Sequence, residues 1–230
     1  NFSKTFMQLP EIDSTDFLKD TPSPFLYGLF SRYIRFLFRM NFHKVRFNME
    51  TVPNLNSSYL FLMNHHSWWD GILPMLIHSK LVPELNPKGM MDEKQLKKLN
   101  FFRKFYVFSV NRTNPRKAIA SINYSREHLS KQGNCLFLFP QGAIYPNDSA
   151  LFQIETGYQH IVKNNDLVKM IPLLSYIETM KGRKPNLWIR FGSELHPSLN
   201  SFNVQNQLTA ELIQLKQEAH EESPKYSRLY

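Results

Sequence analysis

The stretch YLFLMNHHSWWD, residues 59–70, decides how the rest of the chain is interpreted. Its first five residues form an apolar run typical of a buried β-strand, and His65 and Asp70 follow five positions apart. On a regular helix that offset would turn the two side chains about 140° apart, whereas a turn at a strand end lets them meet. A histidine held by a carboxylate can remove a proton from a hydroxyl near neutral pH. The pattern predicts a general base at His65 and an orienting acid at Asp70, although spacing alone also fits an ordinary surface loop.

Apolar runs of strand length alternate with amphipathic stretches along the chain. This order predicts an α/β fold with a single domain, in which a mixed, mostly parallel sheet of about seven strands is flanked by helices. Active sites of such sheets gather at strand ends, and His65, Arg112 and Gln141 each follow an expected strand, which predicts one shared site. The expected strands are residues 45–49, 59–63, 88–91, 106–110, 135–139, 168–174 and 187–191, and the expected helices are residues 25–42, 68–79, 92–105, 115–131, 153–164 and 204–222.

Composition narrows the class of partner. The 230 residues carry a net charge of +9 and include 19 phenylalanines, with a mean hydropathy of −0.39. A basic chain is attracted to polyanions, and without a nucleic-acid motif the favoured partners are anionic lipid headgroups and acyl carriers. The single Cys135 rules out an intrachain disulfide, and its apolar neighbours predict a buried thiol. The histidines lack partners at metal-site spacing, so neither a metal nor a cofactor is expected.

Residues 1–22 are expected to form an irregular arm or a short helix. The helix expected at residues 25–42 follows them and combines a basic stripe with a wide apolar surface. Arg32, Arg35 and Arg39 share one face, and Phe30 belongs to the apolar remainder. This pattern is typical of a helix lying in a membrane interface, although a helix packed on the domain would also show it. No run reaches the roughly 18 apolar residues of a spanning helix, and no signal peptide is visible. We expect attachment to the cytoplasmic face of an anionic membrane.

Four blocks resemble, in order, the motifs of the glycerolipid acyltransferase family, the lysophospholipid or 1-acylglycerol-3-phosphate acyltransferases. The resemblance covers roughly residues 45–195 and implies an acyltransferase domain at residues 45–230, preceded by the arm and helix of residues 1–44. It also implies direct transfer of a fatty acyl group from acyl-CoA or acyl-ACP to a lipid hydroxyl, without an acyl-enzyme. The blocks are Asn64-His65-x-Ser67-x-x-Asp70, Phe108–Arg112, Phe139-Pro140-Gln141-Gly142 and Ile171-Pro172-Leu173.

In this resemblance the substrate-binding positions are Asn64, Ser67, Arg112, Phe139, Pro140, Gln141 and Gly142, with Arg112 associated with the phosphate of the acceptor. The third block departs from the family, because Gln141 replaces a glutamate and Ala143-Ile144 replaces threonine-arginine. The lost charges favour an acceptor other than lysophosphatidic acid, such as a glycosylated or otherwise non-phosphatidic lipid. Trp68 and Trp69 are expected against an acyl chain or in the core.

Two other functions remain open on the sequence. One is a catalytically silent lipid-binding relative that uses the helix at residues 25–42 for attachment. The other is a thioesterase-like hydrolase in which the same dyad activates water. The intact pair of His65 and Asp70 favours the acyltransferase over the silent relative, which has no chemical need of it.

Overall fold

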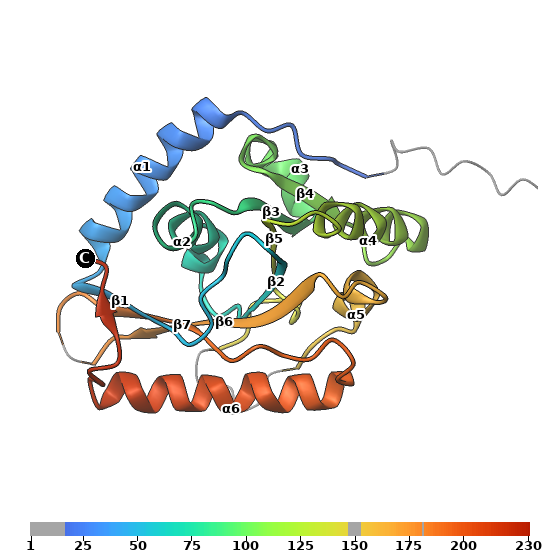
Figure 1. Ribbon diagram of the computed structural model, residues 1–230. Helices are drawn as coiled ribbons and strands as arrows, with labels where there is room; N and C mark the ends of the chain where they lie inside the picture. The colour runs from blue at the N-terminus through green and yellow to red at the C-terminus, as the bar shows by residue number, and fades with distance from the viewer. Residues whose placement is uncertain (1–16, 147–152, 181) are drawn as a thin grey trace, which may run out of the picture.

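An eight-stranded mixed sheet forms the centre of the computed structural model (Figure 1). The structure describes residues 17–146, 153–180 and 182–230, so most of the expected N-terminal arm lies outside the described residues. The strand order is β4-β3-β5-β2-β6-β7-β1-β8, and neighbours are parallel except for the β6–β7 and β1–β8 pairs. The predicted α/β class and mostly parallel sheet are confirmed. The strands are β1 (Lys44–Met49), β2 (Ser58–Met63), β3 (Asn86–Asp92), β4 (Val107–Val110), β5 (Asn134–Leu138), β6 (Val168–Glu178), β7 (Asn186–Phe191) and β8 (Ser227–Arg228).

Helices cover both faces of the sheet, and the central strand β2 is buried along its whole length. Leu60 and Leu62 of this strand point into a core shared with α4, α5 and α6, whereas Phe61 points into a core shared with α1 and α2. Figure 1 shows α6 on one side of the sheet and α2 with α1 on the other. Strands covered on both faces have continuous apolar sequences, which explains the run that begins at residue 59.

Three expected helices differ from the structure. The stretch 68–79 divides into a 3-10 turn and a helix that begins at Leu73. The stretch 92–105 divides at Leu99, whose ψ of 46 is not helical, and the stretch 153–164 is helical only over six residues. The helices are α1 (Pro24–Asn41), η1 (Trp68–Gly71), α2 (Leu73–Leu81), α3 (Glu93–Lys98), η2 (Asn100–Phe105), α4 (Pro115–Leu129), α5 (Gly157–Val162) and α6 (Ser201–His220).

The segment 17–23 covers the edge strand β4 at Leu18 and then contacts η2, where the Thr21 and Ser23 N–H groups donate to the carbonyls of Arg103 and Lys104. The Ser109 N–H donates to the Leu18 carbonyl at 2.8 Å, and the Leu18 N–H donates to the Ser109 hydroxyl at 2.8 Å. Asp20 forms a buried ion pair with Lys88 of β3. An uncovered edge strand can pair with another chain, so this segment removes a site of aggregation.

Helix α1 has two apolar sides, and only one of them packs on the protein. Ile34 and Phe38 are buried beneath it, and the half-buried Phe30 ring stacks on Phe105 of η2 with centroids 4.5 Å apart. Among the described residues, none of the helices combines the length and apolar character of a membrane-spanning segment. A second apolar stripe of α1 remains exposed and consists of Phe25, Leu26, Leu29, Tyr33, Phe36 and Met40.

Candidate active site

The two residues predicted to form a dyad are in contact. His65 follows the end of β2, and Asp70 lies in η1, so the chain turns back through the four residues between them. His65 Nδ1 lies 3.2 Å from Asp70 Oδ2. The Asp70 side chain is 1% exposed, whereas that of His65 is 22% exposed. The carboxylate is therefore enclosed, and the imidazole reaches open space.

Asp70 is held as a carboxylate by donors that converge on it. Its Oδ2 accepts the backbone N–H groups of His66 and Ser67, each at 2.7 Å, and its Oδ1 accepts the Ser175 hydroxyl at 3.3 Å. Burial alone would raise the pKa of Asp70, but the hydrogen bond from His65, the His66 ring and the two N–H groups together lower it. An ionised Asp70 accepts the His65 Nδ1–H, which leaves His65 Nε2 as the proton acceptor.

The neighbouring histidine has a different environment. The His66 side chain is 6% exposed, and burial lowers its pKa despite the opposing charge of Asp70. Asn64 Nδ2 donates to His66 Nδ1 at 2.9 Å. His66 is therefore a neutral, buried ring near pH 7, and only His65 has the exposure that a general base needs.

Asn64 ties the motif to β6. Its Oδ1 accepts the Ser175 backbone N–H at 2.8 Å, and its Nδ2 donates to the Ser175 carbonyl at 2.8 Å. The same serine donates its hydroxyl to Asp70. Sequence analysis missed Ser175, and the available signal was a polar residue in an apolar strand just after Ile171-Pro172-Leu173. Asn64 thus connects the motif to β6 through buried hydrogen bonds, and it does not line the cavity described below.

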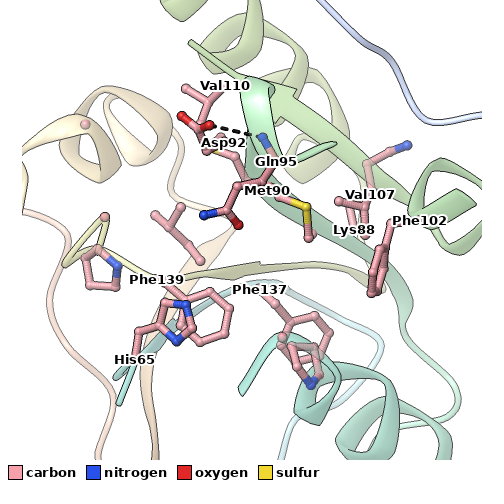
Figure 2. Close-up of a pocket in the computed structure, with 18 of the residues that line it drawn as sticks. His65, Lys88, Met90, Asp92, Gln95, Phe102, Val107, Val110, Phe137 and Phe139 are labelled. Carbon is pink, nitrogen blue, oxygen red and sulfur yellow. Dashed lines mark hydrogen bonds between the residues drawn. The ribbon is translucent and has the colours of Figure 1, made fainter. Parts of the chain in front are cut away.

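The third block supports His65 from the other side. Gln141 is buried, and its Oε1 accepts the backbone N–H of His65 at 2.7 Å. Figure 2 shows the Phe139 ring against the His65 imidazole. The ring centroids are 4.7 Å apart. Gln141 was predicted to bind substrate; in the structure its amide oxygen contacts the backbone of His65, and its side chain does not line the cavity described below. This contact explains why an amide can stand where the family has a carboxylate, since either group accepts a hydrogen bond.

Arg112 and Gly142 meet at the mouth of the site. Arg112 Nη2 donates to the Gly142 carbonyl at 2.9 Å, and Arg112 Nη1 lies 3.7 Å from Glu155 Oε1. Gly142 has a φ of +65, and a Cβ on it would lie 2.2 Å from Arg112 Nη1. Glycine is needed here both for its left-handed conformation and for the close approach of the guanidinium.

A largely apolar cavity of about 330 Å³ opens beside His65. Figure 2 shows Phe139 and Phe137 of the β5 end, Met90 of β3, Val107 of β4 and Phe102 of η2 around it. Such a volume lies at the lower end of the range for small-molecule sites. Of the predicted substrate-binding residues, Arg112, Phe139, Pro140 and Gly142 line this cavity, whereas Asn64, Ser67 and Gln141 do not.

The two tryptophans of the motif are in edge-to-face contact, with ring centroids 5.4 Å apart, but they differ in burial. Trp69 packs on Phe38 and Phe42 in the core, with ring centroids 5.2 and 5.0 Å away. Trp68 is 68% exposed. Across the described parts of the chain, no three His, Cys, Asp or Glu side chains gather as metal ligands would.

Gly142→Ala should reduce the activity of this site by about tenfold or more, because the added Cβ both strains the backbone and displaces Arg112. Steady-state kinetics of the variant and the wild type would measure the change. Gly28→Ala is a matched control, because a Cβ at Gly28 meets nothing within 4 Å. Equal activity of the two variants would contradict the account of this turn.

Comparisons with known proteins identify the family and a similar fold. The model of a family described as Acyltransferase matches residues 44–175, which include the dyad, Arg112 and the third block. The crystal structure of the 1-acyl-sn-glycerophosphate (LPA) acyltransferase PlsC from Thermotoga maritima is similar, with a TM-score of 0.54, 17% identity, and coverage of 87% of this chain and 81% of that chain. At this identity the likeness supports the fold. No curated protein matches. Since the family match covers more than half of the sequence, the chain belongs to the Acyltransferase family and is an acyltransferase.

Proposed function

We propose that this protein transfers a fatty acyl group from acyl-CoA or acyl-ACP to the hydroxyl of a lysophospholipid or related lipid, at the cytoplasmic face of a membrane. The observation that carries the proposal is the His65–Asp70 pair, held at 3.2 Å beside an apolar cavity. The family match supports acyl transfer, and the apolar lining supports a fatty acyl chain. The thioester donor is taken from the resemblance of the four sequence blocks to the glycerolipid acyltransferases.

In the proposed mechanism, His65 Nε2 removes the proton of the lipid hydroxyl while its oxygen attacks the thioester carbonyl. Asp70 stabilises the imidazolium that forms and keeps the ring oriented. When the tetrahedral intermediate collapses, the C–S bond breaks, and the leaving thiolate takes the proton back from His65. The products are an ester and a free thiol, and the enzyme returns to its starting state without an acyl-enzyme.

Cys135 does not offer an alternative nucleophile. It is the only cysteine of the sequence and lies fully buried in β5. Burial raises the pKa of its thiol, so a reactive thiolate does not form at neutral pH. This environment favours direct transfer over a route through a cysteine thioester.

The charge at the mouth favours an acceptor without a phosphate monoester. Among the described residues that line the cavity, the cations are Lys88, which pairs with Asp20, and Arg112, which is bonded to Gly142 and close to Glu155. Ile144, in the position where the family has an arginine, is 59% exposed. A dianion beside His65 would meet one partly neutralised guanidinium, whereas hydroxyl or ester oxygens need only its N–H donors.

An acceptor panel tests the proposal. Purified protein would receive labelled palmitoyl-CoA with lysophosphatidate, lysophosphatidylglycerol, monooleoylglycerol or monoacyl glucosylglycerol. We expect labelled lipid ester with the acceptors that lack a phosphate monoester and less with lysophosphatidate. Release of free palmitate without an acceptor would instead support the hydrolase, and no turnover with palmitoyl-CoA or palmitoyl-ACP would support the silent lipid-binding relative.

The exposed stripe of α1 is the proposed membrane contact. Leu29 is 58% exposed and Phe36 is 56% exposed. Arg32 is exposed beside the stripe, whereas Arg35 donates to the Ser31 carbonyl at 3.3 Å and Arg39 lies over the Tyr230 ring at 4.6 Å. We therefore propose that the membrane is contacted mainly by the exposed apolar stripe of α1. Phe30, Arg32, Arg35 and Arg39, which the sequence suggested, would contribute less. An apolar face beside a cation suits an anionic interface.

Replacing Leu29 and Phe36 together with serine should weaken binding to vesicles of phosphatidylcholine and phosphatidylglycerol by about tenfold or more, since each side chain buried in lipid contributes roughly 1–2 kcal/mol. A flotation assay would measure this. The matched control is Phe202→Ser with Ile213→Ser, which removes two exposed side chains from α6. Equal partitioning of the two double variants would remove α1 as the membrane contact.

A further inference from the structure

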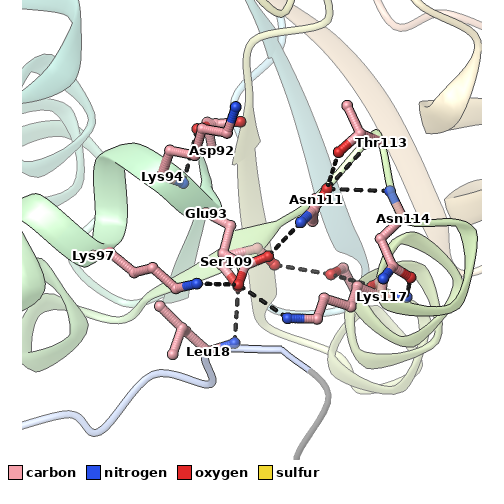
Figure 3. Close-up of polar contacts among 11 residues, drawn as sticks. Leu18, Asp92, Glu93, Lys94, Lys97, Ser109, Asn111, Thr113, Asn114 and Lys117 are labelled. Atoms are coloured by element: carbon pink, nitrogen blue, oxygen red, sulfur yellow. Dashed lines mark hydrogen bonds and ion pairs between the residues drawn. The ribbon is translucent and has the colours of Figure 1, made fainter.

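A buried carboxylate lies behind the loop that presents Arg112 (Figure 3). Glu93 begins α3 and is 3% exposed. Its Oε2 accepts Asn111 Nδ2 at 2.6 Å, and its Oε1 accepts Lys97 Nζ at 2.8 Å and Lys117 Nζ at 3.0 Å. The hydrogen bond from Lys97, opposed by burial and reinforced by Asn111 and Lys117, lowers the pKa of Glu93 to about 2. Glu93 is thus a permanent anion in the physiological pH range.

Asn111 connects this anion to the loop. On the side away from Glu93, its Oδ1 accepts the Thr113 N–H at 3.1 Å, the Thr113 hydroxyl at 2.8 Å and the Asn114 N–H at 3.1 Å. An asparagine that bonds the backbone two and three residues ahead fixes a tight turn. Arg112 lies inside that turn, and its guanidinium reaches the Gly142 carbonyl.

The chemistry of the two side chains fixes the orientation of the Asn111 amide. A carboxylate only accepts hydrogen bonds, so the amide must present its NH2 group to Glu93 and its oxygen to the turn. In the opposite orientation, the amide oxygen would face the Glu93 carboxylate. The amide NH2 group would then face the N–H groups of Thr113 and Asn114, so donors would oppose donors. Glu93 itself does not line the cavity. Asn111 is the residue that links Glu93 to the turn that carries Arg112.

We infer that Glu93 is a positioning residue, which acts through Asn111 to hold Arg112 at the mouth of the acceptor site. The inference rests on the proposed contact of Arg112 with the acceptor. Glu93→Gln keeps the volume but introduces a donor that competes with Asn111, Lys97 and Lys117. The turn then loses its single arrangement, and the guanidinium spends less time over Gly142.

Glu93→Gln should raise the KM for the acceptor by about threefold to tenfold and change kcat by less than about twofold, because the dyad is untouched. The assay uses palmitoyl-CoA and the fastest acceptor of the panel above. In an Arg112→Ala background, the same substitution should have almost no further effect, because the group that Glu93 positions is gone. Loss of folding alone would not produce this dependence on Arg112.

A reciprocal exchange provides the second test. Asn111→Asp alone places two carboxylates against each other and should raise the acceptor KM as much as Glu93→Gln or more. The double variant Glu93→Gln with Asn111→Asp restores a donor facing an acceptor, and the new aspartate still accepts from the turn. We expect the KM to return to within about twofold of the wild-type value. The matched control is Glu211→Gln. Glu211 is a buried acid of α6 that accepts a hydrogen bond from Arg190 of β7. Its substitution should lower the melting temperature and leave the acceptor KM unchanged.

The outcomes separate this inference from the proposed function. If Arg112→Ala raises the acceptor KM and Glu93→Gln adds its full effect on top, Glu93 does not act through Arg112 and the inference is wrong. A double exchange that is no better than the worse single variant would also overturn it. If acyl transfer persists but Arg112→Ala leaves the KM unchanged, the proposed contact of Arg112 with the acceptor is wrong, and the inference fails with it.

Discussion

Replacing His65 with alanine should lower kcat for acyl transfer by about a thousandfold or more, because the lipid hydroxyl then has no positioned base. The acceptor KM should change little, since the cavity and Arg112 remain in place. Steady-state kinetics with palmitoyl-CoA would measure both constants. The structure makes this the largest single effect that we expect, since the His65 ring combines an orienting carboxylate with exposure to the cavity.

The adjacent histidine supplies a matched control. His66→Ala removes an imidazole from the same motif, but that ring is buried and bonded to Asn64. We expect lower thermal stability and a much smaller loss of kcat, within about tenfold. If the two histidine variants lost activity equally, or if His66→Ala lost more, the assignment of the base to His65 would be wrong.

Asp70→Asn should lower kcat by about a hundredfold, less than the histidine variant. The asparagine amide presents only one acceptor where the carboxylate accepts three N–H groups through Oδ2 and a hydroxyl through Oδ1. The His65 ring then loses its fixed tautomer but is still present. The same kinetic assay applies, and a variant as active as the wild type would contradict the role of Asp70.

The Asp70 variant also has a stability signature with a defined pH dependence. The pKa of Asp70 is lower in the folded protein, so its ionised form stabilises the fold above the unfolded pKa of about 3.9. That contribution is lost as the pH falls through the folded pKa. The melting temperature of Asp70→Asn should therefore lie well below that of the wild type at pH 7, and the difference should shrink below about pH 4. A constant difference from pH 7 to pH 3 would show that the charge of Asp70 does not stabilise the fold.

Periodicity was enough to predict most strands of the sheet, whereas the dyad also needed the resemblance of its motif to the glycerolipid acyltransferases. The apolar run at residues 59–63 identifies a strand buried on both faces, and a turn at its end brings His65 and Asp70 together. The two-residue β8 was missed because it is too short to alternate. The break at Leu99 was missed because the residues before it, Glu93–Lys98, are good helix formers.

Contacts between distant residues could not be predicted in the same way. Ser175 reaches Asp70 across 105 positions, and Gln141 reaches the His65 backbone across 76 positions. Each depends on the order of strands in the sheet, which no local pattern specifies. Helical periodicity likewise predicted the apolar surface of α1. It could not predict which side of the helix packs on the domain, because that side is set by contacts with Phe105 and with the core around Phe38.

The most direct test follows the label of palmitoyl-CoA in the presence and absence of an acceptor from the panel, with intact-protein mass spectrometry of the quenched reaction. The account predicts equal amounts of acylated lipid and free CoA from the wild type, almost none from His65→Ala, and no acylated protein. A covalent palmitoyl-protein that forms and decays at the rate of turnover, or undiminished transfer by His65→Ala, would contradict it.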